Sequence, residues 1–244
     1  MNSTVWHESH FADHWLGTAE LYSYRNLTFE SDKLPALSGL ASYFSERHGQ
    51  EYYAGIFSGS IAEALLWAPY HPGCLSRPAK YIAPSWSWTS LIGRIKMKAP
   101  LLPKEGSDSL RGGSVPKSAL EDVRFSLSPE GQNPYGRLKD GLMELTGWLK
   151  NAQMCRMKNE AHLLMTLQAD GKAMASFVLD LAEYAPAPSS AEEVECLAVL
   201  QGNENVIVLK KVRNSTEYER IGLALVDPEW FRVGGARKKR ITVI

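Results

Sequence analysis

The chain has 244 residues, enough for one large domain or two small ones with a sizeable core. Its 27 basic and 27 acidic residues cancel, which argues against nucleic acid or an anionic membrane surface as the main partner. No apolar run approaches the ~20 residues that cross a bilayer. We therefore expect a protein without a nucleic-acid partner and without a membrane span.

The three cysteines, Cys74, Cys155 and Cys196, are isolated in the sequence and odd in number. They form neither a CxxC pair nor a disulfide framework, which is typical of a reducing compartment. The first ten residues lack the basic and apolar regions of a secretory signal. The sequence therefore predicts a soluble, cytoplasmic protein.

The first 70 residues or so are predicted to be mostly helical. Apolar residues at helical spacing predict a first helix over about residues 11–25. We expect one face of this helix to carry four large side chains: Phe11, Trp15, Leu21 and Tyr22.

The second helix has the clearest limits in the sequence. Ser31 and Asp32 offer side-chain oxygens to cap its first turn, and Pro35 stands where a missing N–H costs least. Gly49 is expected to end the helix in a left-handed conformation. Between these limits the apolar residues recur at helical spacing: Leu34, Leu37, Ala41 and Phe44.

A third, short helix is predicted after residues 52–57, which resemble a turn or a short buried segment. Ser60 and Glu63 match a capping box, in which each side chain satisfies the backbone donor of the other residue. Pro69 is expected to stop this helix soon after it begins.

Residues 77–90 form the most distinctive stretch of the chain. Pro78 and Pro84 fix their own φ and disfavour helix in the preceding residues, so the run should be extended. In a strand from residue 85 onward, Trp86 and Trp88 share one face. Two indoles on one face either anchor a core or form a flat platform for a ligand, and the composition favours the core.

The second half of the chain has the periodicity of strands. Residues 103–117 are predicted to be a mobile loop, and Asp227 is expected to cap one helical turn. Turns are expected at Gly141, Gly171, residues 202–203 and residues 214–215. Strands are predicted at 123–127, 142–149, 162–167, 176–181, 195–200, 206–212, 217–226 and 240–244.

These elements predict an α+β fold. A helical N-terminal portion is expected to pack against a mainly antiparallel β region, curled or barrel-like so that few strand edges stay exposed. The expected division is a helical portion over 1–95 that ends in the Trp86/Trp88 strand, a mobile loop or insertion over 96–117, and the β region over 118–244.

No residue pattern reaches the threshold for an active site. His7, His10 and His14 have helical spacing for a metal, but near a chain end they are expected to face solvent. His71 and Cys74 flank a Pro-Gly turn and lack a visible orienting residue. We therefore predict no catalytic, cofactor-binding or metal-binding residue and a protein that is not an enzyme. A hydrolase built on these histidines or on Cys74 stays as an alternative.

A basic cluster over residues 237–240 is compatible with nuclear import or phosphate binding. Apolar Ile241, Val243 and Ile244 follow it directly, so we interpret the cluster as a solvated approach to a final strand.

Several ordered segments resemble the fungal heterokaryon-incompatibility (HET) domain proteins, in the part that lies downstream of the HET domain. They include residues 27–29, 32–41, 53–56, 65–67, 77–88, 141–147 and 218–223. The positions that carry the resemblance best are Asp32, Pro35, Arg77, Pro78, Tyr81, Pro84, Trp86 and Trp88. We call these eight the signature residues and expect their role to be structural.

The resemblance implies a non-enzymatic accessory or interaction module of a HET-type protein. In that family the HET domain triggers programmed cell death after non-self recognition. The chain starts just before the first helix of the downstream block, so we expect the HET domain itself to be absent and the product to be truncated or free-standing. Protein partners are expected, with no cofactor.

One further function from another class is compatible with the sequence. A carbohydrate-binding module would use Trp86, Trp88 or Trp148 as stacking platforms. This alternative requires exposed indoles, whereas a structural role requires buried ones.

Overall fold

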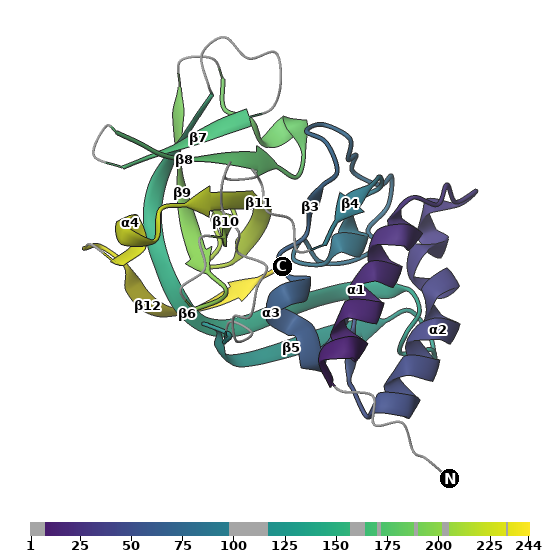
Figure 1. Ribbon diagram of the computed structural model, residues 1–244. Helices are drawn as coiled ribbons and strands as arrows, with labels where there is room; N and C mark the ends of the chain where they lie inside the picture. Colours follow the sequence, from purple (N-terminus) through teal and green to yellow (C-terminus); the bar gives the residue numbers. More distant parts are fainter. Residues whose placement is uncertain are drawn as a thin grey trace.

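The computed structural model describes residues 8–97, 117–156, 164–169, 172–187, 190–201, 205–232 and 234–244. These residues form an α+β protein, as the sequence predicts. Figure 1 shows the curled sheet on one side and the two long helices side by side on the other, with β3 and β4 between them. The predicted 103–117 loop lies outside the described residues, apart from its last position.

The two long helices are α1 (Glu8–Ser23) and α2 (Lys33–His48). In α1 the buried face has a spacing of four, with Phe11, Trp15 and Ala19 all inside. The prediction for Leu21 was wrong, because Leu21 lies two residues beyond Ala19, on the outer face, and is 67% exposed. Gly49 ends α2 with a φ of 64°, as predicted.

The side-chain caps predicted for the second and third helices were wrong. Asp32 ends a 3₁₀ turn (Glu30–Asp32), makes no cap hydrogen bond and instead forms an ion pair with Arg137 at 2.6 Å. Ser60 ends another 3₁₀ turn (Ser58–Ser60) before α3 (Ile61–Ala64), and its hydroxyl also makes no cap bond. Neither residue has the extended backbone that a cap requires, because each lies inside a 3₁₀ turn.

The predicted Trp86/Trp88 strand is absent. Residues 85–86 form a turn and Trp88–Ser90 form a 3₁₀ turn. The reason is local: the Ser87 hydroxyl accepts a hydrogen bond from the Thr89 N–H at 3.0 Å, and such side-chain bonds compete with strand geometry. Both indoles are nevertheless buried, as a core role requires.

Two short pairs of strands and one sheet of eight strands make up the β structure of the described residues. The β1–β2 hairpin pairs Tyr52–Tyr53 with Ile56–Phe57, and β3 (Ala68–Pro69) pairs with β4 (Ile95–Lys96). All eight predicted long strands exist. They are β5 (Glu121–Pro129), β6 (Leu138–Arg156), β7 (Leu164–Ala169), β8 (Lys172–Leu179), β9 (Ala191–Ala198), β10 (Asn205–Lys211), β11 (Tyr218–Val226) and β12 (Arg237–Val243).

Six of these strands close on themselves. The order is β6–β9–β10–β11–β8–β7 and back to β6, with every neighbour antiparallel. The closure is possible because β6 has 19 residues: its second half pairs with β9 and β7, and its first half pairs with β5 and β12. The last strand, β12, also meets β11 in one parallel pair, Tyr218 with Val243. A barrel-like region was predicted, and the pairing confirms it.

The core has two parts. One part fills the interior of the six-stranded ring and includes Phe177, Cys196 and Trp230. The other is continuous from the helices to the outer face of the sheet, where Trp15 and Trp88 share a cluster with Leu145. The proposed division into 1–95 and 118–244 stays a prediction.

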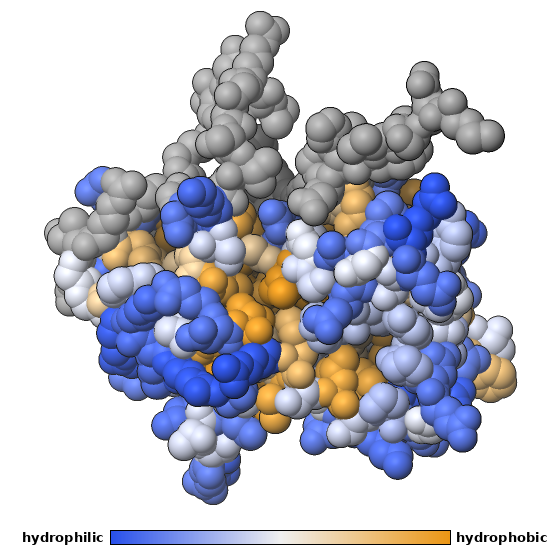
Figure 2. Space-filling model, turned by 90° about the horizontal axis from the view of Figure 1, so that it is seen from below, coloured by the Kyte–Doolittle hydropathy of each residue, from blue (hydrophilic) through white to orange (hydrophobic). Residues whose placement is uncertain are grey.

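Few large apolar side chains reach the surface of the described part of the chain. Figure 2 shows one face with hydrophilic residues over most of its area and apolar residues gathered in hollows. No described helix is long and apolar enough to span a bilayer. The exposed large apolar residues are Leu21, Phe29, Leu40, Tyr43, Tyr81 and Trp148.

Turn predictions in the second half had mixed outcomes. Gly141 lies inside β6, so the turn predicted there was wrong. A Cβ at this position would lie 2.8 Å from Pro84 Cγ, and the glycine instead gives Pro84 room to pack on the strand. Asn214 does form a turn, with a φ of 59°, and Asp227 caps α4 (Pro228–Arg232) through the Glu229 N–H at 2.8 Å. Gly171 and residues 202–203 lie outside the described part.

The basic cluster belongs to β12 itself rather than to an approach segment. Each of its four side chains forms an ion pair with a glutamate on another strand of the sheet. Lys238 pairs with Glu121 at 2.6 Å, and Arg240 pairs with Glu144 at 3.3 Å. The cluster is therefore neutralised within the sheet, which weakens the case for phosphate binding there.

Gly55 gives a first testable consequence of this fold. It closes the β1–β2 hairpin with a φ of 97°, and an added Cβ would lie 2.6 Å from Trp88 Nε1. Gly55→Ala should lower the free energy of unfolding by ~1–3 kcal/mol, since both the backbone and the indole must shift. Denaturant unfolding measures this, with Gly17→Ala as the matched control. Nothing lies within 4 Å of a Cβ at Gly17, so alanine there should be neutral or stabilising.

Candidate binding cleft

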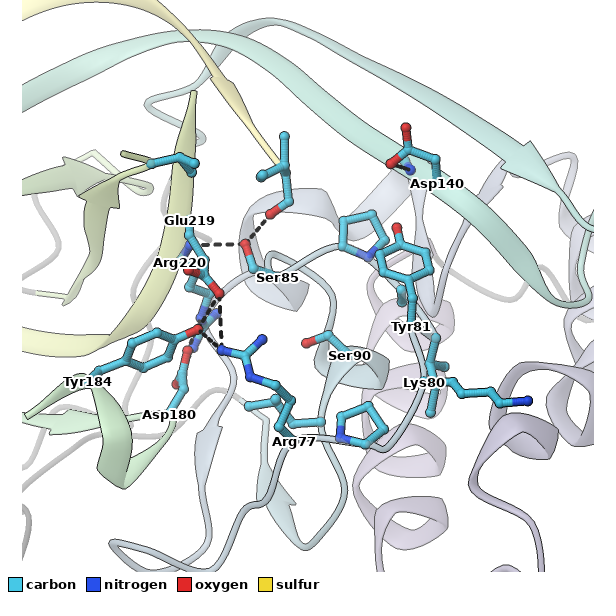
Figure 3. Close-up of a pocket in the computed structure, with 18 of the residues that line it drawn as sticks. Arg77, Lys80, Tyr81, Ser85, Ser90, Asp140, Asp180, Tyr184, Glu219 and Arg220 are labelled. Atoms are coloured by element: carbon cyan, nitrogen blue, oxygen red, sulfur yellow. Dashed lines mark hydrogen bonds and ion pairs between the residues drawn. The ribbon is translucent and has the colours of Figure 1, made fainter. Parts of the chain in front are cut away.

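A cavity of about 500 Å³ lies where the segment before the tryptophans crosses the sheet. Figure 3 shows residues from distant parts of the chain converging on it. One wall is residues 77–85, and the other comes from the end of β8, the start of β11 and the chain end at Ile244. The charged and hydroxyl-bearing residues that line it are Arg77, Lys80, Tyr81, Ser85, Ser90, Asp140, Asp180, Tyr184, Glu219 and Arg220.

The wall of the cleft has unpaired backbone groups. Within the described part of the chain, no hydrogen bond joins the N–H or C=O groups of residues 80–83 to another residue. The amides on either side of this run are bonded: Ala79 donates to Glu30 Oε2 at 3.0 Å, and Ser85 donates to the main-chain oxygen of Ile244 at 3.0 Å. Pro78 and Pro84 flank the run and have no N–H of their own. Backbone groups that do not bond within a protein need water or a ligand, so this wall offers main-chain donors and acceptors.

One end of the wall is fixed by Arg77. Its guanidinium donates to Glu183 Oε1 at 2.8 Å and to the Tyr184 hydroxyl at 2.9 Å, and it also forms an ion pair with Glu219 at 3.4 Å. The Tyr184 hydroxyl donates to Glu219 in turn. Burial lowers the pKa of Arg77, but these partners outweigh burial and the net direction is upward. Burial and the nearby Glu219 raise the pKa of Tyr184. Arg77 is therefore a fixed cation that ties the wall to the sheet.

The floor contains a buried ion pair. Arg220 donates to Asp180 Oδ2 at 2.9 Å, and the two side chains are 0% and 2% exposed. The guanidinium also donates to the carbonyl oxygens of Leu65 and Trp67 and lies 3.6 Å from the centre of the Trp67 ring. Burial raises the pKa of Asp180 and lowers that of Arg220, and each partner opposes the shift of the other. This pair holds the sheet to the segment that contains Trp67.

Ser85 joins the wall to the last strand. Its N–H donates to the main-chain oxygen of Ile244 at 3.0 Å, and its hydroxyl donates to the same oxygen. The hydroxyl also accepts from the Arg220 N–H at 3.0 Å. Its hydrogen-bonding capacity is thus engaged in structure, and no histidine or cysteine lines the cleft to activate it.

On the rim opposite Tyr184, Tyr81 and Asp140 are free to form further hydrogen bonds or ion pairs (Figure 3). Tyr81 is 47% exposed, and within the described residues its hydroxyl forms no hydrogen bond. Burial, with Asp140 nearby, raises the pKa of Tyr81. Asp140 accepts from the Gly141 N–H at 2.8 Å and has no ion-pair partner in the described part of the chain. The rim therefore presents one unpaired negative charge beside an exposed phenol.

Half of the signature residues line this cleft. They are Arg77, Pro78, Tyr81 and Pro84. Trp86 and Trp88 lie below it in the core. Asp32 and Pro35 lie outside it, at the start of α2.

Sequence reasoning missed the residues that the sheet contributes. Asp180, Tyr184, Glu219 and Arg220 all line the cleft. Glu219 and Arg220 lie in the segment 218–223 of the resemblance, but none of the four was predicted to belong to a site. The signal available was an arginine inside the apolar run of β11 and an aspartate directly after β8, since charges in buried strands need partners.

The alternative of a hydrolase built on the N-terminal histidines or on Cys74 finds little support. The His14 side chain is exposed, while His7 and the side chain of His10 lie outside the described residues. No group of three or more potential metal ligands exists among the residues that the structure describes. The Cys74 thiol donates to the Arg94 carbonyl at 3.3 Å and accepts from the backbone N–H of His71 at 3.5 Å, so its bonds are to main chain.

The tryptophan-platform alternative is weakened by burial. Trp86 is 1% exposed and Trp88 is fully buried, so neither can stack on a sugar. Only Trp148 of the three named indoles has an exposed face, at 45%. A single platform residue remains of the three.

Fold and cleft together define an α+β protein with a closed antiparallel sheet and a polar cleft beside it. Comparisons with protein-family models, curated proteins and solved structures gave no match. Function is therefore inferred from the cleft and from the sequence resemblance.

Proposed function

We propose that the protein is a non-enzymatic interaction module that binds an extended segment of a partner protein in the cleft. The observation that carries this proposal is the run of unpaired backbone groups at residues 80–83, beside a cavity of about 500 Å³. An extended peptide satisfies such groups by adding its own main chain alongside, as in β-strand addition. A peptide segment of four extended residues would span ~13 Å.

The side chains of the cleft support binding rather than catalysis. Arg77, Asp180, Glu219 and Arg220 are engaged with one another or with other protein groups, and Ser85 lacks a base. Asp140 on the rim has no ion-pair partner among the described residues, so a lysine or arginine in the bound segment would gain an ion pair with it. The proposed partner is therefore an extended peptide with a basic residue.

We further propose that this module belongs to a fungal HET-type protein and acts in the cytoplasm, in non-self recognition and programmed cell death. The support is the ordered resemblance, together with the position of four signature residues on the cleft wall. A transcript map tests this: a HET domain encoded in frame upstream supports the assignment, and an unrelated upstream domain contradicts it.

Peptide selection on the full chain tests the cleft directly. Hexapeptides selected from a random library should be enriched in lysine or arginine and should protect the amides of residues 80–83 from hydrogen exchange. Asp140→Asn should weaken their binding about tenfold in calorimetric titration, because the ion pair is lost. Tyr43→Ala, which removes an exposed tyrosine of α2, is the control and should bind as wild type does. Failure to select any peptide, or protection elsewhere in the chain, contradicts the proposal.

A further inference from the structure

A second cavity, of about 360 Å³, lies on another side of the N-terminal portion. It forms between the end of α1, the Glu30–Asp32 turn and the loop before β4. It shares no lining residue with the binding cleft. Three cationic side chains line it, Arg25, Lys33 and Arg94, against one carboxylate, Glu30.

Lys33 is the unusual member of this set. It is only 4% exposed, and its ammonium donates to the carbonyl oxygens of Leu91 and, at 3.4 Å, Trp88. The Trp88 ring centre lies 5.2 Å away. An ammonium has three N–H groups, so one is left without an oxygen acceptor in the described part of the chain. Burial without a carboxylate partner lowers the pKa of Lys33 to about 7.

The two arginines also have no counter-charge among the residues that the structure describes. Arg94 lies 4.2 Å above the Tyr24 ring and 5.8 Å from the Tyr70 ring. Neither Arg94 nor Arg25 forms an ion pair with a described residue. Their forked donors match an oxyanion, which accepts two parallel hydrogen bonds from one guanidinium.

The acidic groups around the cavity already have hydrogen-bond or ion-pair partners within the protein. Glu30 Oε2 accepts from the Ala79 N–H, and Glu20 accepts from the Met97 N–H at 2.9 Å. Asp32 is paired with Arg137. The remaining titratable and charged neighbours are Tyr22, whose hydroxyl donates to the Lys33 carbonyl at 3.0 Å, and Lys96, which lies over the Tyr70 ring. Because three cations stand against one carboxylate in the lining, the balance of charge around the cavity is positive when Lys33 is protonated.

We propose that this cavity binds a doubly charged oxyanion, a phosphate or sulfate group, between Lys33, Arg94 and Arg25. The bound anion supplies the counter-charge that Lys33 lacks and accepts its third N–H. Binding therefore favours protonated Lys33, and proton uptake accompanies it.

Sulfate is the probe for this site because it keeps both charges across the relevant pH range. Calorimetric titration with sulfate, against chloride at equal ionic strength, should show saturable binding at about pH 6 and roughly tenfold weaker binding at about pH 8. The reason is that free Lys33 is mostly neutral at the higher pH. Inorganic phosphate should bind at the same site, and singly charged acetate should bind weakly.

Arg94→Gln should weaken sulfate binding about tenfold, since one charge-assisted pair is lost. Arg124→Gln removes an exposed arginine of β5 and is the matched control, with unchanged binding expected. Lys33→Met should remove the pH dependence of sulfate binding. If Lys33→Met does not fold, the Arg94→Gln variant still tests the proposal. Absence of saturable binding, or binding that Arg94→Gln leaves intact, overturns the proposal. Peptide binding in the cleft is measured separately from sulfate binding, so the two proposals can fail independently of each other.

Discussion

Replacing Trp88 with alanine should lower the free energy of unfolding by ~3–5 kcal/mol, enough to unfold a protein of ordinary stability. Trp88 is fully buried, and its indole N–H donates to the Gly55 carbonyl at 2.9 Å. The Trp15 indole donates to the same carbonyl at 2.9 Å. Trp88 thus joins the 3₁₀ turn to α1 and the β1–β2 hairpin. Alanine leaves a cavity at that junction and removes one of the two bonds.

Thermal and denaturant unfolding measure this effect. Trp86→Ala should destabilise to a similar degree, because Trp86 is 1% exposed and its ring packs against that of Phe125, with 5.0 Å between the ring centres. Trp148→Ala is the matched control, since Trp148 is 45% exposed and its loss should cost less than ~1 kcal/mol. A Trp88→Ala variant with an unchanged melting temperature would show that the indole is not part of the core, and the platform alternative would regain support.

The regular elements were largely predictable because their signals are local. Alternation of apolar and polar residues located all eight long strands, and helical spacing located both long helices. Gly49 marked the end of α2 because only glycine adopts a φ of 64° without strain. The second half of β6 was missed, since Lys150 points inward there and interrupts the pattern.

Local signals failed where a side chain had two possible partners. Ser87 could have extended a strand but instead bonds the Thr89 N–H, which bends the chain. Asp32 could have capped α2 but instead pairs with Arg137, which lies 105 residues further along the chain. No sequence pattern ranks such alternatives, because the winning partner is set by the tertiary fold.

The candidate sites depend on the same long-range placement. Arg77 meets Glu183 and Glu219 only because the strands close into a ring beside it. Lysine side chains are normally exposed, so the sequence gives no reason to expect that Lys33 is buried. The prolines singled out the segment that forms the wall of the cleft, but neither the cleft nor the free backbone groups of that segment could be predicted, because both are visible only in the structure.

Replacing Arg220 with methionine should lower the free energy of unfolding by ~3–5 kcal/mol, because it leaves Asp180 buried without its cation. The carbonyl oxygens of Leu65 and Trp67 also lose their donors. Denaturant unfolding at neutral pH measures the change. Arg124→Met, on the exposed face of β5, is the control and should stay within ~0.5 kcal/mol of wild type.

Two further measurements separate the loss of a charge partner from the loss of packing: the pH dependence of the stability of Arg220→Met, and the stability of a double variant that also carries Asp180→Asn. Burial already raises the pKa of Asp180, and removing Arg220 takes away the charge that opposes this shift. A carboxyl with a raised pKa in the folded state stabilises that state at low pH and loses this contribution as the pH rises through the folded pKa. The deficit of Arg220→Met should therefore shrink on acidification. Adding Asp180→Asn should recover part of the loss at neutral pH, because the buried charge is gone. A deficit that is the same at all pH values and in the double variant would mean that Arg220 acts through packing and its carbonyl contacts alone.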